Sequence, residues 1–115
     1  MGTNNGGAPG HPMPFGCHVV VENGGVRLAP SGELDIATTP TLSRLVQAVR
    51  EAGFHDVTID LAEVSFADAR PLRLLLELEE ARRAGQIALT ILPGPTDAQR
   101  VFEVTGTVDR LPFRR

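Results

Sequence analysis

The apolar positions near the start of the chain predict a pair of short strands. The run H-V-V-V-E at 18–22 and the alternating run V-R-L-A at 26–29 are both typical of strands. The N-G-G sequence at 23–25 between them favours a hairpin turn, because Asn and Gly accept a positive φ at little cost. Pro30 has no N–H to donate to a neighbouring strand, so it predicts a sheet edge or a bulge.

A helical period of apolar residues predicts the first helix over residues 38–53. Thr39 is a suitable N-cap, Pro40 suits the first helical position, and Gly53 suits the C-terminal cap. The apolar side chains recur at i, i+3, i+4 and i+7, so one side of this helix is expected to face a core. These residues are Leu42, Leu45, Val46 and Val49.

The rest of the chain predicts strands alternating with helices. Gly85 closes the second helix, and the spacing of Thr96 and Gln99 predicts a capping box that opens the third. The resulting order β-β-α-β-α-β-α predicts an α/β fold, in which helices pack on a mixed β-sheet whose first strand pair is antiparallel. Strands are predicted at 57–61 and 87–92, and helices at 71–84 and from Thr96 to Gly106.

With 115 residues, the chain has the length of one domain. Residues 1–16 contain five Gly and three Pro and little that packs, so they predict a flexible N-terminal tail in which only Phe15 docks. The folded domain is predicted over residues 17–115.

Composition narrows the classes of function. A net charge of −3, with no Trp and no Tyr, gives no electrostatic or stacking surface for nucleic acid. The single cysteine, Cys17, excludes an internal disulfide and a cysteine-cluster metal site. No apolar run reaches the roughly 18 residues of a membrane span. We therefore expect a protein of the reducing cytoplasm with no membrane insertion.

No pattern of catalytic or ligand-binding residues stands out. The three histidines, His11, His18 and His55, are scattered, which favours solvated or structural roles over metal binding. There is no G-x-S-x-G elbow and no Gly-rich phosphate loop after a strand. The acidic run at 77–80 is typical of the solvated side of a helix. We therefore expect no enzymatic activity, no metal and no cofactor.

Two polar segments remain, each placed between a predicted strand and a predicted helix. The first is S-G-E-L-D at 31–35, and the second is V-S-F-A-D-A-R-P at 64–71, where a buried strand is predicted to end near Phe66. Taken alone, Gly32 fits a bulge, and the two aspartates fit a local turn and an N-cap. Arg70 is unusual, because a helix N-terminus carries a partial positive charge.

Three motifs follow one another in a fixed order: G-E-L-D at 32–35, I-D-L-A-E-V-S-F-A-D at 59–68, and V-F-E-V-T-G-T-V-D-R-L at 101–111. Together they resemble the STAS family, named for sulphate transporters and anti-sigma-factor antagonists. The resemblance covers nearly all of residues 18–113, and the last motif resembles the closing helix of that family with its T-G-hydrophobic-D-R-L signature. It implies a STAS-like single domain.

In the antagonist branch of that family, a D-S-S-G sequence carries the serine that a kinase-type anti-sigma factor phosphorylates. The resemblance assigns its Asp to Asp68 and the phosphoacceptor position to Ala69, with Arg70 and Pro71 in the last two positions. Asp35 is expected beside this loop. Alanine has no oxygen to phosphorylate, so the serine switch is predicted to be missing. The nearest hydroxyl, Ser65, lies in a predicted strand.

The resemblance implies a non-enzymatic domain that binds an anti-sigma factor or a related switch kinase. Arg70 has two interpretations: a solvated side chain that pairs with Asp68 or Glu33, or a cation that meets an acidic patch or phosphate on a partner. Two other functions stay open, a STAS subunit docked on an ABC-type lipid or solute transporter and a module that senses a nucleotide or other small ligand. The predicted partner interface comprises Asp35, Asp68, Ala69, Arg70, Pro71 and Arg73.

Overall fold

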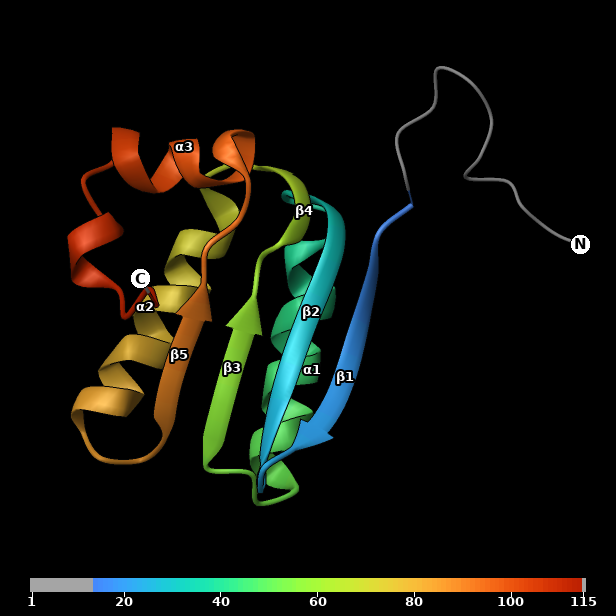
Figure 1. The fold of residues 1–115 in the computed structure, drawn as a ribbon, viewed down its shortest axis with the longest axis vertical. Coiled ribbons are helices and arrows are strands. Elements are labelled where there is room, and N and C mark those ends of the chain that lie inside the picture. Colours follow the sequence, from blue (N-terminus) through green and yellow to red (C-terminus); the bar gives the residue numbers. More distant parts are fainter. Residues whose placement is uncertain (1–13, 115) are drawn as a thin grey trace, which may run out of the picture.

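The computed structural model describes residues 14–114 as one β-sheet with helices packed against it (Figure 1). The elements are β1 (Gly16–Glu22), β2 (Gly25–Leu34), α1 (Thr39–Glu51), β3 (Asp56–Asp60), β4 (Glu63–Ala67), α2 (Arg70–Arg83), β5 (Ala88–Leu92), α3 (Thr96–Val104) and the short 3-10 helix η2 (Val108–Arg110).

Of the predicted N-terminal tail, residues 1–16, the first thirteen lie outside the described residues. Strand β1 begins at Gly16, one residue before the predicted start of the domain. Phe15 is partly buried and packs against the core, as predicted.

Strand β2 organises the sheet because it has neighbours on both sides. It pairs antiparallel with β1 along its length and parallel with two further strands on its other side. Its first part, from Val26 to Leu28, lies beside β3, and its second part, from Ser31 to Leu34, lies beside β4. Strand β5 pairs in parallel with β3 and completes the mixed sheet.

The predicted α/β fold and the hairpin are both confirmed. Asn23 and Gly24 form the turn between β1 and β2, with φ values of 53° and 78°. Both values lie in the left-handed region that Asn and Gly tolerate best. Glu22 and Gly25 then begin the antiparallel pairing.

The predicted order counted one strand between the first two helices, although a strand was also expected to end near Phe66; the structure has two separate strands there, β3 and β4. The chain ends β3 in a turn, where the Asp60 carboxylate accepts the Ala62 N–H at 3.0 Å and Leu61 O accepts the Val64 N–H at 3.0 Å. The next strand, β4, then begins beside the second part of β2. The order is therefore β-β-α-β-β-α-β-α.

Pro30 lies in the central strand, and the predicted sheet edge is wrong. It is buried opposite Cys17, between the last β2–β3 pair at Leu28 and the first β2–β4 pair at Ser31. The missing N–H thus falls where β2 changes partner, so no ladder hydrogen bond is lost there.

Two predicted helix caps are corrected in detail. The N-cap of α1 is Thr38, with Thr39 the first helical residue. The N-cap of α3 is Pro95, with Thr96 inside the helix, and Gln99 folds back so that its Oε1 accepts the N–H of Gly94 at 2.9 Å. The glutamine side chain therefore bonds a backbone N–H in the turn before α3. The Thr96 hydroxyl does not cap the helix.

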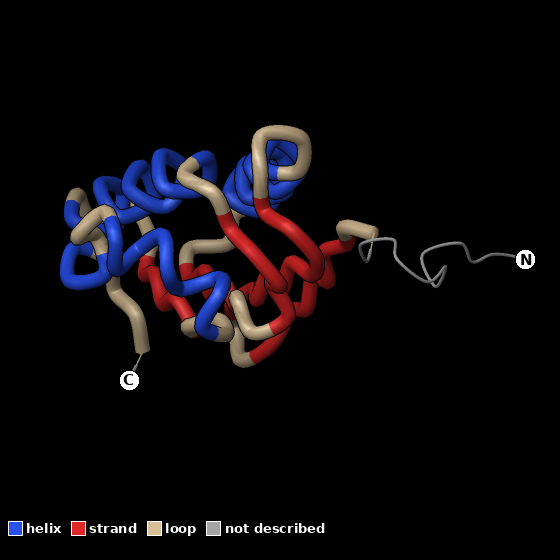
Figure 2. Tube along the Cα trace, turned by 90° about the horizontal axis from the view of Figure 1, so that it is seen from above, coloured by secondary structure: helices blue, strands red, loops and turns tan. Residues whose placement is uncertain are grey.

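Helices α1 and α2 lie on the same side of the sheet, so the molecule has two layers (Figures 1 and 2). The core between the layers is almost wholly aliphatic and includes Leu28, Leu42, Ile59 and Leu75. Helix α3 packs against β4. Within residues 14–114, no helix is long and apolar enough to cross a membrane.

Candidate functional site

The two polar segments singled out in the sequence meet at one end of the sheet. Leu34, the last residue of β2, pairs with Ala67, the last residue of β4. The N–H of Asp68 donates to Leu34 O at 3.0 Å. Because β2 and β4 are parallel neighbours, Asp35 and Asp68 leave the sheet side by side. The predicted closeness of the two aspartates is thus confirmed.

Asp35 shapes the loop between β2 and α1. Its Oδ1 accepts the N–H groups of Ala37 at 2.9 Å and Thr38 at 3.1 Å. The Thr38 hydroxyl accepts the N–H of Asp35 at 2.9 Å and donates to Glu33 O at 2.6 Å. Desolvation raises the pKa of Asp35, but the hydrogen bonds from Thr38 and Ala37 together lower it below its usual value. Asp35 is therefore a carboxylate held ionised by its own loop.

Asp68 performs a similar role at the start of α2. Its Oδ1 accepts the N–H of Arg70 at 2.7 Å, so a side chain satisfies one of the free N–H groups of the first turn. Ala69 is the N-cap, is exposed, and makes no side-chain capping bond. Pro71 is buried in the first turn, where its fixed φ suits the helix.

The first turn of α2 presents two arginines to solvent. Arg70 is exposed and makes no ion pair within residues 14–114, so the predicted pairing with Asp68 or Glu33 is not observed. Arg73 Nε lies 3.2 Å from Glu77 Oε2, one turn along the helix, and its side chain is 89% exposed. Such an exposed i,i+4 pair is worth only a few tenths of a kcal/mol, about 0.3–0.5.

Two exposed apolar residues flank the aspartates, and sequence reasoning missed both. Ile36 follows Asp35 directly and is 65% exposed, while Phe66 lies two residues before Asp68 and is 48% exposed. Large exposed apolar side chains on the loops around the aspartates are candidates for a docking surface. A buried strand was predicted to end near Phe66; in the structure Val64 of that strand is buried, but Phe66 is not.

Ser65 is more accessible than its predicted place in a strand suggested. The β2–β4 pairing shifts at this point, so that Gly32 faces Val64 and Glu33 faces Phe66, leaving Ser65 as the extra residue of a bulge. Its side chain is exposed. We name the surface formed by Asp35, Ile36, Phe66, Asp68, Ala69 and Arg70 the aspartate rim.

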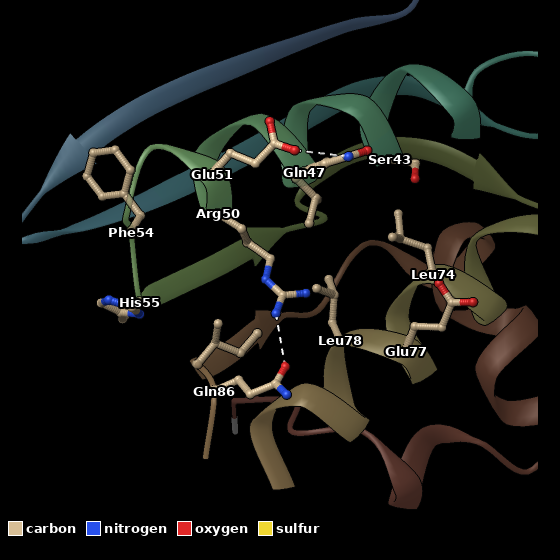
Figure 3. A pocket seen from close by; sticks show the side chains of 12 residues that line it. Ser43, Gln47, Arg50, Glu51, Phe54, His55, Leu74, Glu77, Leu78 and Gln86 are labelled. Carbon is tan, nitrogen blue, oxygen red and sulfur yellow. Dashed lines mark hydrogen bonds between the residues drawn. The ribbon is translucent and has the colours of Figure 1, made fainter. Parts of the chain in front are cut away.

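A groove lies elsewhere, between α1 and α2, with a volume of about 440 Å³ (Figure 3). Arg50 crosses it and donates to Gln86 Oε1 at 3.2 Å, while Leu74 and Leu78 line its apolar side. None of the aspartate-rim residues lines this groove. In the part of the chain that the structure describes, no group of three His, Cys, Asp or Glu residues is placed to hold a metal ion.

The structure is thus a small α/β domain in which two polar segments meet at one end of the sheet. A family model described as "Mlab, STAS domain" matches residues 17–112. An anti-sigma-B factor antagonist of Staphylococcus epidermidis is 36% identical over 78 residues, which cover 68% of this chain and 72% of that protein. The corresponding protein of Staphylococcus aureus is 33% identical over the same shares of both chains.

Solved structures support the fold. An anti-sigma factor antagonist from Mycobacterium paratuberculosis superposes with a TM-score of 0.73 and 22% identity, covering 87% of this chain and 85% of that one. The anti-sigma factor antagonist SpoIIAA in its unphosphorylated form gives a TM-score of 0.68 and 16% identity, with 89% of each chain covered. The chain belongs to the STAS domain family.

The loop bonds of Asp35 predict an acid-dependent contribution to stability. The folded pKa lies below the unfolded one, so the carboxylate stabilises the fold above its ordinary pKa of about 3.9, and this contribution disappears as the pH falls through the folded pKa. Urea unfolding at a series of pH values should show Asp35→Asn less stable than wild type at pH 7, with the difference shrinking below about pH 4.

The matched control is Glu80→Gln. Glu80 is exposed in the second half of α2 and makes no ion pair within residues 14–114, so its replacement should have little effect at any pH. A difference for Asp35→Asn that stays constant down to acid pH would show that its carboxylate charge does not hold the loop.

Proposed function

We propose that this STAS domain is a non-enzymatic interaction module of the cytoplasm that binds an anti-sigma factor or a related switch kinase without the serine phosphorylation switch. The observation that carries the proposal is Ala69. This residue stands exposed at the start of α2, beside Asp68 and at the position where the resemblance expects the phosphoacceptor serine.

The surface around Ala69 has the chemistry of a protein interface. Ile36 and Phe66 supply exposed apolar area, and the ionised Asp35 and the exposed Arg70 supply charges of both signs. Protein interfaces combine an apolar centre with a few well-placed charges, and arginine and aromatic residues frequently carry most of the binding energy. Relatives named anti-sigma-B factor antagonists support an anti-sigma factor as the partner.

The absence of a hydroxyl at residue 69 makes the binding independent of the usual modification. A phosphoryl group adds a charge of about −1.5 to −2 at a helix start and thereby changes docking. Alanine cannot accept that group, and the Pro71 ring restricts the backbone two residues later. The domain is therefore proposed to bind its partner constitutively.

The experiment is a calorimetric titration with the kinase-type anti-sigma factors encoded in the same genome, with and without ATP. We expect tight binding to one of them that ATP does not abolish, and mapping of phosphopeptides should find the loop at 67–71 unmodified. Because Ser65 is exposed, Ser65→Ala serves as the control for off-site modification. Binding to a transporter subunit or to a nucleotide, with no anti-sigma factor bound, would contradict the proposal.

Arg70→Ser tests whether the cation of the aspartate rim contacts the partner. Arg70 makes no ion pair within residues 14–114, so we expect it to contribute to the complex and its removal to cost about 2 kcal/mol, or roughly thirtyfold in affinity. Arg83→Ser, an exposed arginine at the other end of α2, is the matched control and should leave affinity unchanged. An equal effect of both variants would point to a general charge effect and remove Arg70 from the interface.

A further inference from the structure

The two outer strands of the sheet, β5 and β1, differ in what pairs with their outer edges. At β5, the C-terminal segment pairs with the outer edge at Ile91: the N–H of Ile91 donates to Pro112 O at 3.1 Å, and the N–H of Arg114 donates to Ile91 O at 2.8 Å. At the opposite edge, β1 pairs only with β2 within the described residues 14–114. An open edge strand offers a row of free backbone groups that can pair with another strand.

Strand β1 also exposes apolar side chains on the face that the helices cover. Val19 pairs with Leu28 and Val21 pairs with Val26, and both partners in β2 are buried in the core. Opposed residues of an antiparallel pair point to the same face. Val19 and Val21 therefore extend the core face past the edge of its helical cover, where they are 45% and 64% exposed.

Helix α1 continues this apolar strip. The side of α1 towards α2 carries Ser43, Gln47 and Arg50, which line the groove in Figure 3. At 100° per residue, the opposite side carries Leu45, Ala48 and Ala52, and it bears no charge. Leu45 is only half-buried and both alanines are exposed. Small, uncharged residues on a helix beside an open strand allow a second helix to approach closely.

We propose that β1 pairs antiparallel with β1 of a second copy of this chain, forming a two-fold dimer centred on Val20. In that register, Val19 faces Val21 of the second copy, and His18 faces its Glu22. The same contacts recur in the second half of the interface, as an isologous dimer requires. The valine pairs continue the apolar face, and the two His18–Glu22 pairs lie on the other face of the sheet.

The hydrogen-bonding parity of β1 agrees with this register. The two-residue turn makes Glu22 and Gly25 a hydrogen-bonded pair. Counting back along β1 from Glu22, every second residue therefore directs its backbone N–H and C=O groups towards β2. Cys17, Val19 and Val21 then direct their backbone groups outward, and the proposed register places Val19 opposite Val21 as a bonded pair. Glu22 already accepts Arg27 Nε at 3.1 Å through Oε2, which leaves Oε1 for His18 of the second copy.

The dimer would leave both aspartate rims free. Strand β2 ends at the rim, and β1 runs antiparallel to it. A two-fold axis through Val20 therefore sends the two rims to opposite ends of a continuous sheet. The inference goes beyond the proposed function, because it predicts a bivalent molecule, and dimerisation can be measured with no anti-sigma factor present.

The sharpest test is disulfide formation in the full chain with Cys17→Ser. A Val20→Cys substitution should give a covalent dimer under mild oxidation, because opposed residues of a non-bonded antiparallel pair have Cα atoms about 4.5 Å apart, within the range of a disulfide. Val19→Cys is the matched control, since the two cysteines would be diagonal neighbours about 7–8 Å apart, too far for an unstrained bridge. Equal cross-linking of both variants, or stronger cross-linking at 19, would overturn the register.

Sedimentation equilibrium of the full chain provides the second readout. Wild type should show a concentration-dependent dimer that Val21→Lys abolishes, that His18→Glu weakens, and that His18→Glu combined with Glu22→His restores. Circular dichroism establishes that each variant is folded. A wild-type chain that stays monomeric at all concentrations overturns the proposal. Dimerisation only after removal of residues 1–13 also overturns it, because the tail would then occupy the edge.

Discussion

Replacing Phe102 with alanine is expected to lower the free energy of unfolding by about 3–5 kcal/mol, the largest effect of any substitution considered. Phe102 is 1% exposed, and its ring meets Phe113 edge-on with centroids 5.1 Å apart. Its carbonyl oxygen accepts the N–H of Thr107 at 2.9 Å, in the turn that leads the chain back to β5. Loss of the ring leaves a cavity that this backbone turn cannot close.

Thermal unfolding should show the effect as a fall in Tm of more than about 10 °C, given roughly 4–8 °C per kcal/mol for a domain of this size. Val104→Ala is the control on the same helix, because Val104 is 78% exposed and its loss should change stability by no more than about 0.5 kcal/mol. Because α3 packs against β4, the Phe102 variant should also weaken partner binding at the aspartate rim near the melting temperature. Similar Tm values for both variants would show that α3 is not part of the cooperative core.

Ala69→Asp is expected to weaken partner binding by at least about 2 kcal/mol while leaving the fold no less stable. The added carboxylate would stand beside Asp68 and Asp35 at the centre of the proposed interface, where an unmatched charge must be desolvated on docking. The same carboxylate lies at the N-terminus of α2, where the helix dipole favours it by about 0.3–1 kcal/mol. Binding and stability should therefore change in opposite directions.

Ala84→Asp gives the matched control at the other end of the same helix. Ala84 is the C-cap of α2 and is exposed, so an added carboxylate there should lower stability slightly through the dipole and leave affinity intact. Calorimetric titration and urea unfolding of both variants measure the two quantities separately. If Ala69→Asp binds as tightly as wild type, the start of α2 does not contact the partner.

The helices and the hairpin could be predicted from the sequence because short-range patterns determine them. The apolar period of α1 and the Asn23-Gly24 turn depend on residues close in the chain, and both were confirmed. The closeness of Asp35 and Asp68 could be expected for a similar reason, because each follows a strand and precedes a helix. The cap at Thr38 was missed, because Asp35 bonds the loop from three residues away.

Other features depended on pairing between distant segments. The predicted order did not count the strand that ends near Phe66 separately from the strand at 57–61, because β4 is distinguished from β3 by its pairing with the second part of β2. A buried strand was predicted to end near Phe66, yet the bulge at Ser65 shifts the β2–β4 register at this point and Phe66 lies exposed.

By itself, the sequence determined the α/β class, the three helices, the hairpin and the lack of a hydroxyl at residue 69, since residue type and local spacing decide each of these. Only the tertiary structure decided that Ile36 and Phe66 lie exposed beside the aspartates, and that within residues 14–114 the C-terminal segment pairs with β5 at Ile91 while β1 pairs only with β2. Those features depend on which segment lies next to each strand. Backbone pairing between distant parts of the chain, around β2 and β5, determines these neighbours.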